Sequence, residues 1–222
     1  MSMDWVDLTQ TIGPKMPGVA IREAKNLEKD GWNAVNIDIY SHSGTHMDAP
    51  VHFGVEGPTV DQMPLDRLMG PAKILDLTGV LPSSLIQVED LVRLKEPINQ
   101  GDSLIIKTGW SKFSSTDPEK YRYQLPRISE KLARWLVEKE VKILAVEPPS
   151  VANVNDLAEV TLIHRILFSG QIIIVEGICN LDEIKVEEVE LMVMPLKIGG
   201  GDGAPARVLA RPLHKNRSHE GQ

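Results

Sequence analysis

The chain has 222 residues, a formal net charge of −7 and a pI near 5.4, and 42% of its residues are hydrophobic. This length fits one domain, and the acidic balance disfavours nucleic acid and anionic membranes as partners, since both need a concentrated basic face. The start, MSMDWVDLTQ, does not resemble a secretory signal, no apolar run is long enough to span a membrane, and the single cysteine fits a reducing compartment. We therefore expect a soluble, cytoplasmic domain over residues 1–210 and a polar C-terminal tail over 211–222.

The first 140 residues contain three predicted strands and two predicted helices. In residues 34–42, AVNIDIYSH, apolar side chains alternate with Asn36, Asp38 and Tyr40, which is the period-two pattern of a half-buried strand. Apolar runs that end at glycine predict buried strands over residues 72–79 and 102–109. Helical periodicity after a serine that can cap the first turn predicts helices over 83–96 and 129–140.

The second half adds further strands. Apolar and β-branched runs predict strands over residues 141–149, 171–177 and 188–198, with a short helix over 161–170 among them. The glycine-rich segment GGGDGAPARVLA follows the last of these strands. Because strands outnumber helices without alternating regularly with them, we expect a mixed α+β or α/β domain with a central, partly barrel-like sheet.

Residues 42–52, HSGTHMDAPVH, hold three of the six histidines and an aspartate. Imidazole nitrogens and carboxylate oxygens are ligands of zinc, manganese and iron(II). His42, His46 and Asp48 would point to one side of a straight strand, but four residues span roughly 13 Å, which is too far for two imidazoles to share one ion. We therefore expect the chain to bend at Ser43–Gly44 and gather these side chains around a metal.

A second pair of possible ligands lies later in the chain. His164 falls in the first turn of the predicted helix, and Glu176 falls at the end of the strand that follows it. A helix and the next strand run in opposite directions when packed, so the two side chains are expected at one edge of the fold. The alternative is a polar helix start and an exposed strand end without a metal.

HSGTHMDAPVHF resembles the signature of the Putative cyclase family, which includes bacterial kynurenine formamidases and isatin hydrolases. Further matches follow in the same order along nearly the whole chain: DLTQTI at 7–12, PLDRLMGPAKILDL at 64–77, LAVEPPSV at 144–151, HRILFSGQIIIVEGICNLDEI at 164–184 and PLKIGGGDGAPARVLA at 195–210. The resemblance implies a swivelling β/β/α domain, usually a homodimer in which the partner subunit closes the active site.

The resemblance also implies a role for each candidate site residue. His42, His46 and Asp48 are implied to bind one metal, and Asp48 to bridge to a second metal held by His164 and Glu176. The implied acid/base residue beside the bound water is the last histidine of the motif, His52. The cofactor is expected to be two divalent ions, zinc or alternatively manganese.

The sequence departs from the family pattern at two places. Residues 147–150 are Glu-Pro-Pro-Ser where the family usually has Asp-Thr-Pro-Ser, and we expect this change to alter the hydrogen bonding behind the ligands. Residues 16–20 are Met-Pro-Gly-Val-Ala, whereas kynurenine formamidases commonly carry Trp-Pro-Gly-Asp after the Met-Pro. That stretch helps line the family's substrate pocket, so N-formylkynurenine itself is not a settled substrate.

These features predict a metal-dependent hydrolase of a small amide, either an arylformamide similar to N-formylkynurenine or a cyclic amide. A divalent ion lowers the pKa of bound water from about 15.7 to about 7, and a second ion can polarise the carbonyl. His52 would carry the proton to the leaving nitrogen. Two alternatives stay open: a metal-dependent cyclase or lyase that stabilises an enolate, and a non-catalytic protein that binds a metal or metabolite.

Several other residues are given structural roles. Trp110 and Trp135 are expected in the core or an interface, whereas Trp32 is the better candidate for substrate contact. Cys179 has no matching base, so a thiol nucleophile is disfavoured. The GGGDG run opens no helix, which disfavours a phosphate-binding loop. His214 and His219 are expected in the polar tail.

Overall fold

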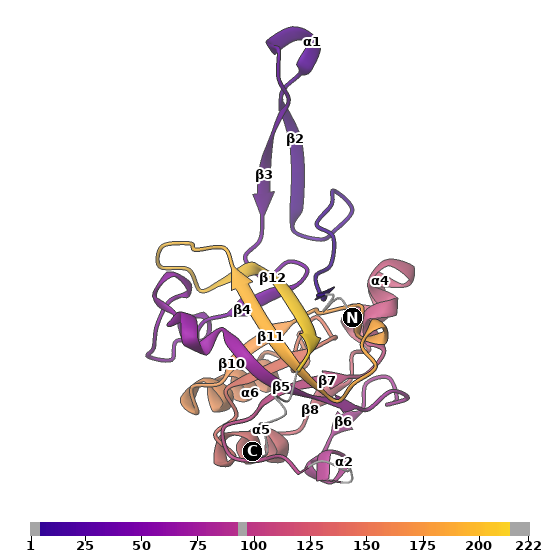
Figure 1. The fold of residues 1–222 in the computed structure, drawn as a ribbon, viewed down its shortest axis with the longest axis vertical. Helices are drawn as coiled ribbons and strands as arrows, with labels where there is room; N and C mark the ends of the chain where they lie inside the picture. Colours follow the sequence, from indigo (N-terminus) through magenta and orange to yellow (C-terminus); the bar gives the residue numbers. More distant parts are fainter. Residues whose placement is uncertain (1–4, 93–96, 214–222) are drawn as a thin grey trace, which may run out of the picture.

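The computed structural model describes residues 5–92 and 97–213. A mixed sheet closes into a barrel in the order β12-β11-β5-β7-β9-β10-β4, because β4 pairs with β12 as well as with β10 (Figure 1). The strands of the barrel are β4 (His46–Asp48), β5 (Met69–Asp76), β7 (Ser103–Lys107), β9 (Ile143–Val146), β10 (Ile173–Glu176), β11 (Glu188–Pro195) and β12 (Gly203–Pro212). The short β1 (Val6–Asp7) also pairs with β12. The expected mixed, barrel-like fold is confirmed.

The adjacent strands β5, β7, β9 and β10 run parallel, and the middle of this set is buried on both faces. Along β7, Ile105 packs inside the barrel, whereas Leu104 and Ile106 join the core between the barrel and its helices. Strands buried on both sides carry continuous rather than alternating apolar runs. This explains why the predicted buried strands over 72–79, 102–109, 141–149 and 171–177 are all found.

Two helices cover one side of the barrel, α5 (Glu130–Glu138) and α6 (Leu157–Ser169). Ser129 caps α5 by accepting the N–H of Leu132, as the sequence predicts. The predicted start of the second helix at Thr161 is wrong. The Asp156 carboxylate caps α6, and the helix begins at Leu157, four residues before Thr161. His164 therefore lies in the middle of α6, not in its first turn.

The helix predicted over residues 83–96 is only partly correct. Ser83 has a left-handed backbone with φ 57° and begins no helix. Residues Leu85–Ile86 form β6, which pairs with β8 (Arg127–Ile128), and only Val88–Val92 form a helix, α2. Positions 93–96 lie outside the described residues. The remaining elements are α3 (Phe113–Thr116), α4 (Pro118–Tyr123) and 3-10 helices over Pro50–Phe53 (η1), Val60–Gln62 (η2), Leu65–Arg67 (η3), Trp110–Lys112 (η4) and Leu181–Glu183 (η5).

An antiparallel pair of strands projects from the barrel as an arm (Figure 1). It consists of β2 (Val19–Lys25), β3 (Ala34–Ile39) and the connecting α1 (Leu27–Asp30). The predicted strand is present. The prediction that its apolar face is buried is wrong for the single chain, since Val35 and Ile37 are 55% and 58% exposed. Their alternation produces an apolar face on the arm that no other described element covers.

The last strand, β12, was not predicted, because the final predicted strand covers residues 188–198. β12 begins at Gly203, the last residue of the glycine run that the sequence assigned to a turn, and it extends to Pro212, two residues into the predicted tail over 211–222. The predicted positions of His214 and His219 lie outside the described residues. Within the part of the chain that the structure describes, no helix is long and apolar enough to cross a membrane.

Candidate metal centre

The barrel brings three segments of distant sequence together at β4. In the antiparallel pairing with β10, Glu176 lies opposite His46, and in the pairing with β12, Gly203 lies opposite Asp48. Helix α6 is tied to the 3-10 helix that follows β4, because the Arg165 guanidinium donates to the Phe53 carbonyl. The histidine motif is therefore flanked by one strand on each side and by α6.

The bend predicted between the first two histidines is present. Gly44 has φ 65°, a left-handed conformation that favours glycine, and β4 begins two residues later. The Ser43 hydroxyl donates to the Pro17 carbonyl, and the Thr45 hydroxyl donates to the Gly177 carbonyl at 2.6 Å. The first bond ties the bend to the chain before the arm, and the second ties it to the segment that carries Glu176.

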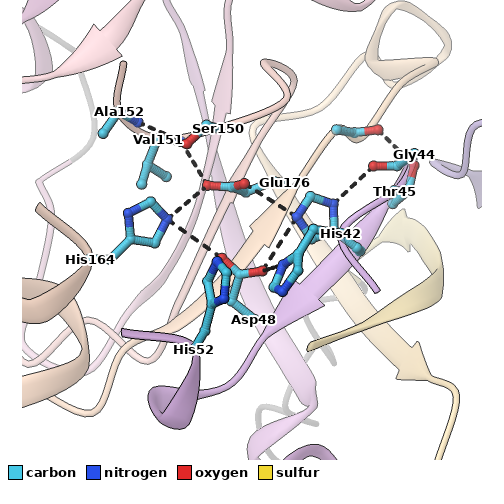
Figure 2. A network of polar contacts seen from close by, with 12 residues as sticks. His42, Gly44, Thr45, Asp48, His52, Ser150, Val151, Ala152, His164 and Glu176 are labelled. Carbon is cyan, nitrogen blue, oxygen red and sulfur yellow. Dashed lines mark hydrogen bonds and ion pairs between the residues drawn. The ribbon is translucent and has the colours of Figure 1, made fainter. Parts of the chain in front are cut away.

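The five predicted ligands form one cluster, in which all but the partly buried His42 are buried. Figure 2 labels four of them: His42, Asp48, His164 and Glu176. His42 Nδ1 lies 2.7 Å from Asp48 Oδ1, and His46 Nε2 lies 3.3 Å from both Asp48 Oδ1 and Glu176 Oε2. His164 Nε2 lies 3.6 Å from Asp48 Oδ2 and 3.4 Å from Glu176 Oε1. The structure thus brings together the two sequence segments that were expected to meet.

The cluster is electrostatically coupled. Burial lowers the pKa of the His46 and His164 imidazoles, but the carboxylates of Asp48 and Glu176 raise it by more, to about 10. Burial raises the pKa of Asp48 and Glu176, as does their mutual repulsion for Glu176, but the facing imidazoles hold both pKa values below the ordinary range. Two buried anions thus face nitrogens that hold protons in the absence of a cation.

The donors fit a divalent cation. Asp48 Oδ2 is buried and has no hydrogen-bond partner among the described residues, an arrangement that is costly unless a ligand completes it. Ligand atoms of His46, Asp48 and Glu176 lie within 4.8 Å of one another, as do those of His42, Asp48 and His52. Asp48 belongs to both groups, as predicted for a bridging ligand. The prediction assigned His46 to the same ion as His42, whereas here His46 groups with Glu176. Which residues bind a metal stays a prediction.

The predicted acid/base residue lies at the edge of this cluster. The His52 ring stacks on the His42 ring with centroids 3.8 Å apart, and 23% of its side chain is exposed. Its partial burial is the largest influence on its pKa, which lies below the ordinary histidine value. His52 is therefore neutral at physiological pH and exposed to an incoming molecule.

Two residues of the site were not identified from the sequence, Asp202 and Gly203. Asp202 Oδ2 lies 3.1 Å from His42 Nε2 and 3.4 Å from His52 Nδ1. A Cβ on Gly203 would lie 2.5 Å from His42 Cε1. The signal available in the sequence was a carboxylate between glycines in the GGGDG run, which was assigned only to a turn.

The unusual Glu147 is buried, and its carboxylate serves a neighbouring turn. It accepts the backbone N–H groups of Thr108 and Gly109 and the hydroxyl of Ser111. The segment after Glu147 contacts the cluster through its backbone, since the Val151 N–H donates to Glu176 Oε1 at 2.7 Å. The altered side chain at 147 therefore does not contact the predicted ligands.

The other singled-out residues are placed as follows. Trp110 is buried, and Trp135 packs on the core between barrel and helices, as expected. Trp32 directly follows α1 at the tip of the arm and is 57% exposed, so within one chain it does not reach the cluster. Burial raises the pKa of the Cys179 thiol to about 11, which agrees with its not being a nucleophile.

Comparison with known proteins places the chain in a family. A kynurenine formamidase from Bacillus cytotoxicus is 28% identical over 217 residues, which is 95% of this chain and 98% of that protein. A solved structure described as a potential metal-dependent hydrolase with cyclase activity is 29% identical, covers 96% of this chain and 100% of its own, and superposes with a TM-score of 0.78. Isatin hydrolase A from Ralstonia solanacearum shares the fold, with a TM-score of 0.84 at 23% identity over 95% of this chain and 92% of its own. A family model described as Putative cyclase matches residues 6–153, which is more than half of the sequence, and the chain therefore belongs to the Putative cyclase family.

Proposed function

We propose that this protein is a metal-dependent hydrolase that opens the amide bond of a small aryl amide, either an arylformamide or a cyclic amide. The observation that carries this proposal is the buried Asp48, which faces three imidazoles and leaves its Oδ2 without a hydrogen-bond partner among the described residues. A buried carboxylate surrounded by histidine nitrogens is a site for a divalent cation. The family relationship supports the same chemistry.

His42, His46 and Asp48 would hold one ion, and Asp48, His164 and Glu176 would hold a second. When bound, such ions supply a water of lowered pKa and Lewis acidity toward a carbonyl oxygen. The backbone holds the ligands in place before any ion binds, because the His46 Nδ1–H and His164 Nδ1–H groups can donate to the carbonyls of Gly44 and Val160. Each of these rings is thereby left with Nε2 directed at the carboxylates.

His52 would move the proton. Its ring is neutral at physiological pH, lies next to His42 and has an exposed edge, so it can take a proton from the attacking water. The same nitrogen can then donate to the amide nitrogen as the C–N bond breaks, which an amide requires. This assignment gives His52 a role in proton transfer and not in holding the metal.

Aromatic side chains beside the cluster support an aryl substrate. Phe53 stacks on His164 with centroids 4.4 Å apart, and the exposed Tyr40 lies 5.5 Å from the His42 ring. Aromatic rings bind other aromatic rings through offset or edge contacts. The names of the relatives, kynurenine formamidase and isatin hydrolase, agree with this class of substrate.

The test measures metal and activity on the same samples. Metal content is determined by mass spectrometry for wild type and Asp48→Ala, and both are assayed with an arylformamide and with a cyclic aryl amide in isotopically labelled water. Bound metal, hydrolysis with label in the product, and loss of both in the variant are expected. A wild-type protein that takes up no zinc or manganese would refute the proposal. Turnover without label would indicate a lyase or cyclase instead.

The protein is also proposed to act as a homodimer. The arm projects from the barrel and leaves Val35 and Ile37 exposed, and the Asp202 side chain at the site is 46% exposed. An isolated pair of strands is marginally stable in water. A second copy of the chain would cover the apolar face of the arm and the open side of the cluster together. The resemblance to a family of dimers supports this arrangement.

A further inference from the structure

Each imidazole in the cluster has one nitrogen directed at the buried carboxylates and a second nitrogen beside an oxygen acceptor. For His46 and His164 the acceptors are the backbone carbonyls of Gly44 and Val160, at 3.0 and 2.7 Å. For His42 the acceptor is a side chain, because Nε2 lies 3.1 Å from Asp202 Oδ2 while Nδ1 faces Asp48. The ring of His42 is thus oriented by a group that a substitution can remove.

The segment that carries Asp202 is fixed by backbone bonds both to the histidine motif and to η2. The Asp202 carbonyl accepts the N–H of Ala49 at 2.8 Å, and the Gly201 carbonyl accepts the N–H of Val60 at 3.1 Å. Gly203, opposite Asp48 in the sheet, leaves room for the His42 ring that any Cβ would occupy. The backbone of Asp202 is therefore fixed beside the histidine motif, which keeps its carboxylate within reach of the His42 ring.

The same carboxylate oxygen also reaches the predicted acid/base residue. Asp202 Oδ2 lies 3.4 Å from His52 Nδ1, and the His42 and His52 rings stack with an interplanar angle of 24°. One oxygen therefore contacts both rings of the stack. An acceptor shared in this way restricts the rotation of each imidazole about its Cβ–Cγ bond.

We propose that Asp202 is a positioning residue that accepts the Nε2–H of His42, so that Nδ1 is presented to the metal, and holds His52 against the same ring. The inference rests on the proposed metal-dependent function and extends it to a residue from the loop between β11 and β12. A ligating histidine usually donates its other N–H to an oxygen acceptor, and loss of that acceptor lowers metal affinity roughly 10- to 100-fold.

The test compares Asp202→Ala, Asp202→Asn and Asp61→Ala with wild type. Asp61, in η2, is the matched control. Its carboxylate accepts the N–H of Gly200, in the loop that carries Asp202, but contacts neither His42 nor His52. Cobalt(II) and zinc affinities are measured by titration of the metal-free proteins, together with the visible spectrum of the cobalt form. Thermal unfolding of the metal-free proteins checks that each variant is folded.

Asp202→Ala is expected to lose roughly 10- to 100-fold in metal affinity and to change the cobalt spectrum. The metal affinity of Asp202→Asn should lie between those of wild type and Asp202→Ala, since its amide oxygen still accepts a hydrogen bond but carries no charge. Asp61→Ala should keep wild-type affinity. Unchanged affinity and spectrum in Asp202→Ala, or an equal loss in Asp61→Ala, would overturn the role of the carboxylate. Wild type that binds no metal would instead overturn the proposed function, and the inference with it.

Discussion

At the scale of single residues, Gly203 is the position where the structure makes the sharpest prediction. A Cβ there would lie 2.5 Å from His42 Cε1, so alanine must displace the ring. We expect Gly203→Ala to weaken metal binding at least tenfold, as loss of a group that orients a ligand does. The control is Gly199→Ala in the same loop, where a Cβ meets nothing within 4 Å. Equal affinities of the two variants in a zinc titration would contradict this account.

His52 should separate catalysis from metal binding. His52→Gln keeps a polar side chain but removes the group that is proposed to transfer the proton. Proton transfer by a placed side chain contributes roughly 10²- to 10⁴-fold, so kcat should fall in that range while metal content stays at the wild-type level. Because His52 also lies within reach of an ion shared with His42 and Asp48, loss of metal in the variant would identify it as a ligand instead.

The sequence predicted the composition of the cluster better than its surroundings. His42, His46 and Asp48 were predictable because three potential ligands lie within a seven-residue segment that contains a glycine bend. Folding alone does not require such a cluster. Asp202 was not, because one aspartate in a glycine run fits an ordinary turn equally well. Its proximity to His42 depends on β12 pairing with β4, a contact between residues far apart in the sequence.

At the scale of elements, the arm provides a test of assembly. Val35 and Ile37 share one face of β3. Asn36 lies on the other face, where it pairs with Arg22 of β2. If a second copy covers the apolar face, Val35→Asp and Ile37→Asp should each shift the protein toward monomer in light scattering, since a charge would be buried there. Asn36→Asp adds the same charge on the other face and should leave the mass unchanged. A monomeric wild type would refute the dimer.

The outcomes for individual elements show what local patterns determine. Strands buried on both sides and the helix capped by Ser129 were predictable, since their signals are contained within a few residues. The start of α6 was misplaced because Thr161 and Asp156 are both acceptable caps, and it is the Asp156 carboxylate that accepts the N–H groups of Ala158 and Glu159. Alternation in β3 correctly indicated a strand but did not reveal that its apolar face lacks a neighbour in the same chain.

For the whole molecule, the general class and a partly barrel-like sheet were predictable, and the strand pairs that close the barrel were not. Periodicity indicated several strands with few helices, and no local feature specifies that β4 pairs on both sides. That double pairing places Glu176 and Gly203 on either side of the motif, so closure of the barrel and assembly of the site are the same event. The stability of the fold should therefore depend on how the charges in the cluster are balanced.

This balance predicts how stability changes with pH in the metal-free protein. The pKa values of His46 and His164 are about 10 in the folded chain against an ordinary 6.5, so their contribution is complete below pH 6.5 and is lost as pH rises through about 10. Asp48 and Glu176 have lowered pKa values, so their contribution is present above their ordinary values of 3.8 and 4.5 and is lost as pH falls through the folded pKa. Metal-free protein should thus be most stable between about pH 5 and 6.5.

The measurement is thermal unfolding between pH 6.5 and 9.5, with chelator and with stoichiometric zinc. We expect the melting temperature to fall with rising pH in chelator, and to fall less with zinc, because an ion replaces the protons that the histidines would otherwise lose. His164→Gln removes one of the two raised imidazoles and should reduce the fall in chelator. The same fall in the metal-free and zinc-loaded proteins would show that the cluster is not its origin, since these two forms differ only in what balances the two buried carboxylates.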